Sequence, residues 1–266
     1  MSATGLLITS RLGVRFRNRP LATRDDLDRR IEILRRTSLR TLNQLAAIQP
    51  AWIIQTDESH VEYLRSVFSD PSRMPLERGI VPQVVGRAGS RLVASDLAAL
   101  RLPWARFLCL RLDSDDHYLS RELLASTKRW ADLPVGTVVE FPRGYLIDIR
   151  SNDVIRHSYL EIVGPFYGIL TNPDNPIAAI GDHTVATAGR DRVLVTRRTW
   201  VQTVHGGNFL TTLKRQTAIG LLQRVRRRFI RGFARRPMAC LAMSPLDLMR
   251  PSAATLERVR QAVREA

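Results

Sequence analysis

The N-terminal part of the chain alternates between short apolar runs and longer stretches in which apolar residues recur at a helical period. Apolar runs of about four to eight residues are typical of buried strands, and the wider spacing is typical of amphipathic helices. The pattern predicts strands at 6–10, 51–56, 79–85 and 107–112. Pro82 favours a sheet edge for the third strand. Helices are predicted over 23–48, with an interruption of the period at Thr37-Ser38, from 61 onward and over 95–102. This order indicates a parallel sheet built from right-handed crossovers.

Beyond Gly136 the pattern changes to shorter apolar runs with turn residues between them. Such runs predict strands at 138–141, 144–149, 158–163 and 192–196, and a loop at 171–176. We interpret them as an antiparallel extension of the sheet. Helical spacing returns over 217–234 and 252–265, with Pro237 ending the first of these segments. We therefore divide the chain into an α/β domain, 1–212, and a basic helical extension, 213–266.

Size and composition are those of a globular protein. The 266 residues are 44% hydrophobic and 25% charged, which suits one large α/β domain or two small ones. No apolar run reaches the roughly 18 residues of a transmembrane helix. The N-terminus has neither the charged leader nor the cleavage site of a signal peptide. Cys109 and Cys240 lack zinc-ligand spacing and indicate reduced thiols in a cytoplasmic protein.

The net charge of +16 is concentrated near the C-terminus. Residues 192–246 contain no Asp or Glu, but they contain twelve positive charges. Such a block favours an anionic partner such as phospholipid, nucleic acid or nucleotide, although it is also compatible with a solvated basic face. An apolar stripe that includes two Phe residues runs along the helix predicted at 217–234, and five arginines lie largely around it. This helix either packs on the domain or lies at an anionic membrane surface, and the sequence leaves both readings open.

An acidic cluster follows the apolar strand at 107–112. Asp113, Asp115 and Asp116 fall where this strand leaves the sheet, and ligands of open α/β sheets bind at the carboxyl ends of strands. In extended backbone, Asp113 and Asp115 would point the same way. Carboxylate pairs of this kind suit Mg²⁺ or Mn²⁺, which also hold phosphates. The pattern predicts a metal–diphosphate site, whereas a solvated acidic turn is the simpler alternative.

Several segments together resemble a GT-A glycosyltransferase. They are Leu6–Leu12, Thr41–Gln44, Trp52–Ser59, Arg111–Asp116 and Trp200–Asn208. More narrowly, the first strand, the acidic element and the late Trp…His-Gly-Gly-Asn element are similar to those of a bacterial rhamnosyltransferase family. The resemblance covers about residues 5–210 and omits the basic tail. It implies a Rossmann-like, mostly parallel central sheet with helices on both faces.

The resemblance also implies a divalent metal, Mn²⁺ or Mg²⁺, that neutralises a leaving diphosphate. Asp115 and Asp113 would stand at this metal, with Asp116 close by. His205 would complete its ligands, unless it lies in a glycine turn with no ligand role. Gly206 and Gly207 would let that loop approach phosphate and offer backbone N–H groups to it.

Other residues are candidates for binding the nucleotide sugar. Asp57 follows the second strand, where related enzymes place a carboxylate that holds the ribose or the base, although it also suits a helix N-cap. Arg11 lies at the end of the first strand and Arg87 follows the third, and a guanidinium fork suits diphosphate oxygens. Arg111 precedes the acidic cluster and neutralises it in the simplest reading.

An inverting transfer requires a carboxylate base near the acceptor hydroxyl. Asp182 and Asp116 are the predicted catalytic carboxylates, and Glu161 is an alternative to Asp182. His117 follows the acidic cluster and is expected to face either the acceptor or a helix. The sequence leaves the choice of base open, and a retaining mechanism would need none.

The sequence thus predicts a cytoplasmic, metal-dependent glycosyltransferase that is peripheral to the membrane if the basic helix binds lipid. It would move a sugar, rhamnose by the family resemblance, from a nucleoside-diphosphate sugar to a cell-surface glycan or glycolipid. One alternative is a protein that binds nucleic acid or anionic lipid through the basic block. The low aromatic content of 6% and the lack of a nucleic-acid motif count against nucleic acid. A metal-dependent nucleotidyltransferase or phosphohydrolase is the other alternative.

Overall fold

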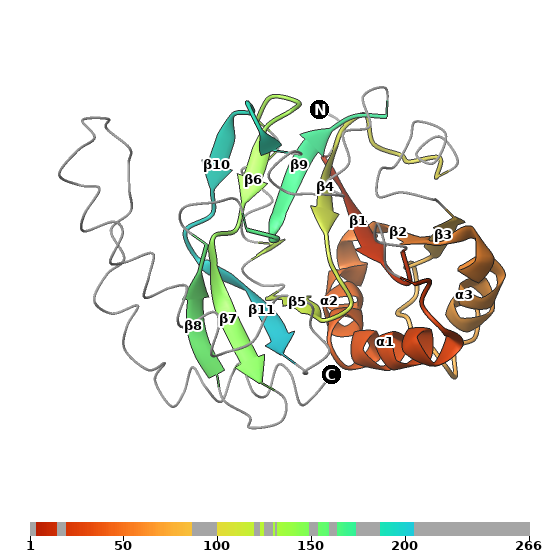
Figure 1. Ribbon diagram of the computed structural model, residues 1–266. Helices are drawn as coiled ribbons and strands as arrows, with labels where there is room; N and C mark the ends of the chain where they lie inside the picture. Colours follow the sequence, from red (N-terminus) through yellow and green to blue (C-terminus); the bar gives the residue numbers. More distant parts are fainter. Residues whose placement is uncertain are drawn as a thin grey trace.

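The computed structural model describes residues 4–14, 20–86, 100–119, 123–124, 130, 132–148, 154–159, 164–173 and 187–204. Two β-sheets and three α-helices are described in these ranges (Figure 1). The predicted mixed α/β class with a mostly parallel central sheet is confirmed. The extension 213–266, its helix at 217–234 and most of the helix predicted over 95–102 lie outside the described residues.

Seven strands form the central sheet, in the order β10-β6-β9-β4-β1-β2-β3. Their bounds are β1 Gly5–Arg11, β2 Ala51–Thr56, β3 Pro82–Gly86, β4 Phe107–Arg111, β6 Val138–Glu140, β9 Tyr167–Thr171 and β10 Arg192–Leu194. The pairs β1–β2, β2–β3, β1–β4 and β6–β10 are parallel. As Pro82 predicted, β3 lies at the edge of the sheet.

Strand β9 is antiparallel to both of its neighbours, β4 and β6. We did not predict this strand from the hydrophobic pattern. In this region we predicted only the loop at 171–176. Gly168 allows the close approach of β4, since a Cβ atom at this position would lie 2.8 Å from Cγ of Leu108. The run Tyr167–Thr171 is buried throughout, so β9 completes the centre of the sheet.

The predicted antiparallel extension differs in the structure: the strands expected at 138–141 and 192–196 lie in the central sheet as β6 and β10 and pair parallel, and most of the strand expected at 158–163 lies outside the described residues. A separate four-stranded sheet, which includes the strand expected at 144–149, has the order β5-β11-β7-β8. Its strands are β5 Asp116–Tyr118, β7 Arg143–Asp148, β8 Val154–Ser158 and β11 Arg198–Val204. β7 is antiparallel to β8 and β5 is antiparallel to β11, whereas β7 and β11 run parallel. Trp200 of β11 stacks on Phe166 with ring centroids 4.0 Å apart, and Tyr118 meets Phe166 edge-on. These rings join the second sheet to the core of the first.

Three helices follow the first two strands: α1 (Arg24–Arg36), α2 (Ser38–Leu45) and α3 (Val61–Phe68). Short 3₁₀ turns, η1 (Ala46–Ile48) and η2 (Glu58–His60), adjoin α2 and α3. Thr23 caps α1 as predicted: its hydroxyl accepts from the N–H of Asp26, and the Asp26 carboxylate accepts from the N–H of Thr23. The helix predicted over 23–48 is broken at Thr37, where the apolar period weakens.

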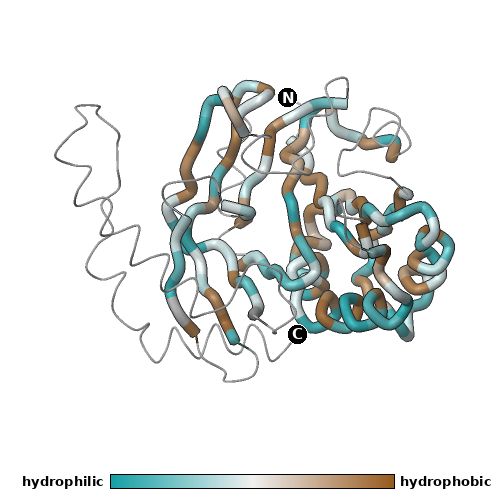
Figure 2. The backbone as a smooth tube through the Cα atoms, viewed as in Figure 1, coloured by the Kyte–Doolittle hydropathy of each residue, from teal (hydrophilic) through white to brown (hydrophobic). Residues whose placement is uncertain are grey.

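All three helices pack on one face of the central sheet. Leu27 of α1, Leu42 of α2 and Leu64 of α3 belong to the same buried cluster as Trp52 of β2. In Figure 2, α1 alternates between hydrophobic and hydrophilic residues, as expected for a helix that buries one side. On the opposite face the described residues form a smaller cluster, which Trp104 and its neighbours cover in part. None of the described helices is both long and apolar enough to span a bilayer.

Candidate functional site

The predicted acidic cluster lies at the carboxyl ends of the two central strands, β1 and β4. These strands are parallel neighbours, and Thr9 is in register with Arg111. The N–H of Leu112 donates to the carbonyl of Thr9 at 2.9 Å, which extends the pairing by one residue. Arg11 ends β1 and Arg111 ends β4, so two cationic side chains lie at the same edge of the sheet as the carboxylates.

Residues 113–116 form a turn, which differs from the extended backbone that we expected. The N–H of Asp116 donates to the carbonyl of Asp113 at 3.1 Å and closes the turn. The argument that Asp113 and Asp115 point the same way because they lie two residues apart in a strand is therefore wrong. The turn ends β4 and starts β5, so it carries the chain from the central sheet into the second sheet.

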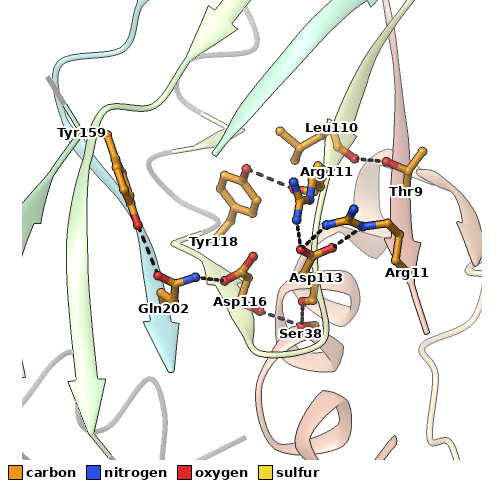
Figure 3. Close-up of polar contacts among 10 residues, drawn as sticks. All are labelled: Thr9, Arg11, Ser38, Leu110, Arg111, Asp113, Asp116, Tyr118, Tyr159 and Gln202. Carbon is orange, nitrogen blue, oxygen red and sulfur yellow. Dashed lines mark hydrogen bonds and ion pairs between the residues drawn. The ribbon is translucent and has the colours of Figure 1, made fainter. Parts of the chain in front are cut away.

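Two hydroxyl groups at the break between α1 and α2 hold this turn. The Thr37 hydroxyl lies 2.7 Å from the carbonyl oxygens of both Ser114 and Ile33. The Ser38 hydroxyl lies 2.7 Å from the carbonyl oxygens of both Asp113 and Asp116 (Figure 3). Both hydroxyl-bearing residues are buried. The break in the helix thus places two donors against carbonyl groups of the turn.

Asp113 lies between two arginines (Figure 3). Its Oδ1 accepts from Nε of Arg11 at 3.4 Å, and its Oδ2 accepts from Nη2 of Arg11 at 3.1 Å and also from Nη2 of Arg111. The side chains of Arg11, Arg111 and Asp113 are 12%, 10% and 21% exposed. Burial alone would raise the pKa of Asp113, but the two guanidinium charges hold it well below its usual range. Asp113 is therefore an ionised carboxylate in a charged triad, and Arg111 neutralises it as predicted.

Asp115 and Asp116 experience the opposite electrostatic balance. Burial and the nearby charge of Asp113 raise the pKa of Asp115 to about 6. Burial, and then repulsion from Asp115 and Asp113, raise the pKa of Asp116 well above its ordinary value. Like charges that crowd together in this way are stabilised by a proton or by a cation. These two carboxylates are therefore the part of the site that favours added positive charge.

Contacts from the second sheet position the same two residues. Oδ1 of Asp116 accepts from Nε2 of Gln202 at 3.3 Å, and Oε1 of Gln202 accepts from the hydroxyl of Tyr159 at 3.4 Å (Figure 3). The carbonyl of Asp115 accepts from the N–H of Thr203 at 2.9 Å. Strand β11 thus fixes the turn from the side opposite the helices.

His117 faces a helix, which is one of its two predicted environments. Its Nδ1 lies 2.8 Å from the hydroxyl of Thr41 on α2. Burial, and then the charge of Arg40, lower the pKa of His117 to about 4. The imidazole is therefore neutral at physiological pH, with Nδ1 as the acceptor if the Thr41 hydroxyl donates to it.

Asp57 caps η2, as the simpler of its two predicted roles requires. Its Oδ1 accepts from the N–H of Ser59 at 3.1 Å and from the Ser59 hydroxyl at 2.8 Å. It lies directly after β2, at the same edge of the sheet as the acidic turn. A contact with ribose or base stays a prediction.

The remaining predicted residues lie outside the described part of the chain; they are Arg87, Glu161, Asp182, His205, Gly206 and Gly207. Three arginines of the basic block do fall within it: Arg192, Arg197 and Arg198. Nε of Arg192 pairs with Glu140 at 3.3 Å, and Arg198 donates to the carbonyl of Gly144 at 3.0 Å. Two of these positive charges thus contact the sheets, and Arg197 is exposed.

Within the described ranges, no group of three or more His, Cys, Asp and Glu side chains has the arrangement of a metal site. The chemistry of Asp115 and Asp116 nevertheless fits a hard cation, because both are oxygen donors whose raised pKa values reflect burial and repulsion from neighbouring carboxylates. Asp113 fits less well, because both of its oxygens already bind guanidinium groups.

Sequence reasoning missed several residues that build this site. Gln202 lies inside the Trp200–Asn208 element that we singled out, but nothing in its local pattern connects it with Asp116. Thr37 and Ser38 were noticed only as an interruption of a helix. Tyr159 was read as part of a strand. Each of these residues acts through a contact with a distant part of the chain, and local periodicity carries no record of such contacts.

Fold and site together define a mixed α/β protein with a charged cluster at the carboxyl ends of its central strands. No protein-family model and no curated protein sequence matches this chain. Among solved structures, one similar chain is a Bacillus anthracis protein described as a glucose-1-phosphate thymidylyltransferase, in complex with sucrose. The two chains are 12% identical, the match covers 82% of this chain and 95% of the other, and the TM-score is 0.38. A likeness of this extent carries no argument about activity.

Proposed function

We propose that this protein is a metal-dependent glycosyltransferase that uses a nucleoside-diphosphate sugar as its donor. The observation that carries the proposal is the convergence of opposite charges at the ends of β1 and β4. Arg11 and Arg111 supply cationic forks, and the turn that follows β4 supplies three carboxylates. A nucleotide-sugar transferase needs both signs of charge, because its donor brings an anionic diphosphate and its metal needs oxygen ligands.

The residues at the strand ends would bind either the metal or the diphosphate. Asp115 would hold the metal, together with the sequence-predicted ligands Asp113 and His205, and Asp116 lies beside them. Bound Mn²⁺ or Mg²⁺ would act as a Lewis acid on the leaving diphosphate. Arg11 would donate to diphosphate oxygens, for which a guanidinium fork has matching geometry.

The sequence-predicted partners of this core remain part of the proposal. Asp57 would contact the ribose or base, and Arg87, Gly206 and Gly207 would contact phosphate. Asp116 and Asp182 are the candidates for the carboxylate that accepts the proton of the acceptor hydroxyl. The Gln202 amide, which donates to Asp116, would keep that carboxylate oriented. By the family resemblance the donor sugar is rhamnose, and the acceptor is a glycan or glycolipid made at the inner face of the membrane.

Thermal stability in the presence of nucleotides tests this proposal. Nucleoside diphosphates and nucleotide sugars would be added with and without Mn²⁺ to the wild type, to Asp115→Asn and to Asp25→Asn, whose exposed carboxylate serves as the matched control. A ligand at about one hundred times its Kd adds about 2.7 kcal/mol of stability. For a chain of this size that is a shift of roughly 5–10 °C. We expect this shift for one nucleotide with Mn²⁺ in the wild type and the control, and its loss in Asp115→Asn.

Analysis of the products then separates the enzyme classes. Glycosyl transfer or sugar hydrolysis releases a nucleoside diphosphate, whereas attack within the diphosphate releases a sugar phosphate. The second product would replace our proposal with a nucleotidyltransferase or phosphohydrolase that uses the same cluster. If no nucleotide stabilises the folded protein while DNA or anionic vesicles bind in a salt-sensitive way, the basic block is the functional element and the proposal fails.

A further inference from the structure

The arginine side chains at the ends of β1 and β4 already bind an anion, the carboxylate of Asp113. Its Oδ1 accepts from Nε of Arg11, and its Oδ2 accepts from Nη2 of Arg11 and from Nη2 of Arg111 (Figure 3). A guanidinium fork binds a carboxylate and a phosphate in the same way, through parallel N–H groups. Asp113 therefore fills the position from which a phosphate group of a ligand would accept these hydrogen bonds.

This ion-pair cluster is accessible from solvent. The side chains of Asp113, Arg11 and Arg111 are 21%, 12% and 10% exposed. The two contacts of Arg11, at 3.1 and 3.4 Å, are longer than the roughly 2.7–2.9 Å that is usual between a guanidinium group and a carboxylate. Asp113 and Arg11 thus combine exposed surface with long contacts, which favours exchange of the carboxylate for another anion.

The Asp113 carboxylate can leave the arginines without a change in the backbone. The carbonyl oxygen of Asp113 is 2.7 Å from the Ser38 hydroxyl and accepts from the N–H of Asp116 at 3.1 Å. These contacts fix the main chain of the turn, so the exchange requires only rotation of the side chain to another staggered rotamer. Asp115 belongs to the same turn and is also partly exposed. A cation bound at Asp115 would therefore attract the Asp113 carboxylate over a short distance.

The charges of the cluster favour such an exchange once a metal is present. Arg11 and Arg111 carry two positive charges, and Asp113 carries one negative charge. A diphosphate has more negative charge and more oxygens than a single carboxylate, so it can satisfy both forks. While Asp113 stays between the arginines, it occupies their N–H groups and repels the diphosphate. This conflict ends when a divalent metal in the turn gives Asp113 a different cationic partner.

We propose that Asp113 is the resident anion of a diphosphate site formed by Arg11 and Arg111, and that metal binding in the turn frees this site by drawing the Asp113 side chain away. The inference rests on the proposed function for the identity of the metal and the donor. The ligand-free protein keeps the site closed with its own carboxylate. In the loaded protein Asp113 faces the metal and the two arginines face the diphosphate. Metal and donor therefore bind cooperatively, because the departure of Asp113 serves both.

Titration with inorganic diphosphate in the presence of EDTA tests the arginine side of the exchange. Calorimetry would compare the wild type, Asp113→Asn, and Asp113→Asn combined either with Arg11→Gln or with the exposed control Arg65→Gln. We expect Asp113→Asn to bind metal-free diphosphate roughly tenfold or more tightly than the wild type, because the competing charge is gone. Arg11→Gln should remove this gain and Arg65→Gln should keep it. Equal or weaker binding by Asp113→Asn, or no binding by either protein, would overturn the inference.

Titration with Mn²⁺ alone tests the metal side of the exchange. We expect Asp113→Asn to lose roughly tenfold or more in Mn²⁺ affinity, as the loss of a metal-site carboxylate requires. Arg11→Gln should bind Mn²⁺ roughly threefold or more tightly, because the arginine no longer competes for Asp113 and a nearby positive charge is removed. A variant that merely disturbs the turn would instead weaken Mn²⁺ binding.

Unchanged Mn²⁺ affinity in Asp113→Asn, or unchanged or weaker Mn²⁺ binding by Arg11→Gln, would contradict the exchange. Far-UV circular dichroism checks that each variant is folded. If Asp113→Asn does not fold, the direction of the change in Arg11→Gln decides the question. Arg65→Gln is again the control, and its Mn²⁺ affinity should equal that of the wild type.

The two proposals fail in different ways. Each titration contains a single ligand, so direct contact between Mn²⁺ and diphosphate contributes to neither result. If both titrations change as expected while no nucleotide stabilises the protein, the exchange stands and the glycosyltransferase proposal fails. If one nucleotide with Mn²⁺ stabilises the wild type but Asp113→Asn changes neither titration, the glycosyltransferase proposal stands and the exchange is wrong.

Discussion

The two hydroxyl groups that hold the acidic turn provide the sharpest test of how the site is built. Ser38→Ala removes one hydroxyl from a residue that is fully buried, and Thr37→Val replaces a hydroxyl with a methyl group of similar size. Neither change leaves a large cavity, so the result should report mainly on hydrogen bonds. The acceptors at risk are the carbonyl oxygens of Ile33 and Ser114 for Thr37, and of Asp113 and Asp116 for Ser38, each at 2.7 Å. Each hydroxyl has one proton, so it donates to one acceptor of its pair at a time.

The expected loss can be worked out from these contacts. A buried acceptor left without a donor costs about 1–3 kcal/mol. The carbonyl of Asp113 keeps its bond from the N–H of Asp116, which moderates the loss in Ser38→Ala. We therefore expect each single variant to lose about 1–2 kcal/mol of its free energy of unfolding. Because both hydroxyls hold the same turn, the double variant should differ from the sum of the two by more than about 0.5 kcal/mol.

Equilibrium unfolding in urea measures these losses, and thermal unfolding should show a fall of roughly 2–8 °C in Tm for each single variant. The same samples would be titrated with Mn²⁺, because residues that orient metal ligands commonly change metal affinity by roughly tenfold or more. The control is Ser69→Ala, whose exposed hydroxyl donates only to the carbonyl of Ser66 at 3.2 Å. We expect this control to stay within about 0.5 kcal/mol of the wild type.

The outcome that would refute this reasoning is a Ser38→Ala variant as stable as the Ser69→Ala control. Water would then replace the hydroxyl, and the turn would not depend on the break between α1 and α2. A stability loss with unchanged Mn²⁺ affinity would keep the structural role of the hydroxyl but would separate it from the metal site.

Three further predictions concern the frame around the site. Gly144→Ala should cost about 3 kcal/mol by overpacking, because a Cβ atom at Gly144 would overlap the ring of Trp200; a variant of unchanged Tm would contradict this close approach. Burial lowers the pKa of His157 to about 4, so the unfolded state binds a proton more tightly than the folded state does. The neutral imidazole therefore contributes its full share to folding stability above about pH 6.5, and this share is lost as the pH falls toward 4. Between pH 6.5 and 4, the free energy of unfolding in urea should fall by about 2 kcal/mol less in His157→Gln than in the wild type. If the two proteins lose the same stability over this pH range, the prediction is wrong. Thr23→Ala should cost about 1 kcal/mol through its broken capping box with Asp26, and a similar loss from the matched variant Thr23→Ser would argue against the cap.

Much of the central sheet followed from local patterns. Strands β1, β2 and β4 are short apolar runs, and the helices between them have the expected apolar spacing, so periodicity located them within a few residues. The edge position of β3 followed from Pro82, because a proline cannot donate to a neighbouring strand. These features could be read from the sequence because each depends on residues close together in the chain.

The antiparallel parts were harder to predict. β9 carries an apolar run like the other strands, but its place between β4 and β6 depends on pairing with residues far away in the sequence. Strands β7 and β8 belong to a second sheet because they pair with each other and β7 pairs with β11, and Trp200 of β11 joins this sheet to the core by stacking on Phe166. Local periodicity distinguishes strand from helix, but it does not select the partner of a strand.

In the candidate site, too, local features could be predicted from the sequence, whereas contacts between distant segments could not. The amino-acid sequence alone established that carboxylates follow a buried strand and that an arginine ends each of the two central strands, because these features are contiguous in the chain. Only the tertiary structure decided that Asp113 turns to Arg11 and Arg111, that Gln202 reaches Asp116, and that a break between two helices holds the turn. Those contacts join segments that are far apart in sequence, and the electrostatic balance of each carboxylate depends on which segments the fold brings together.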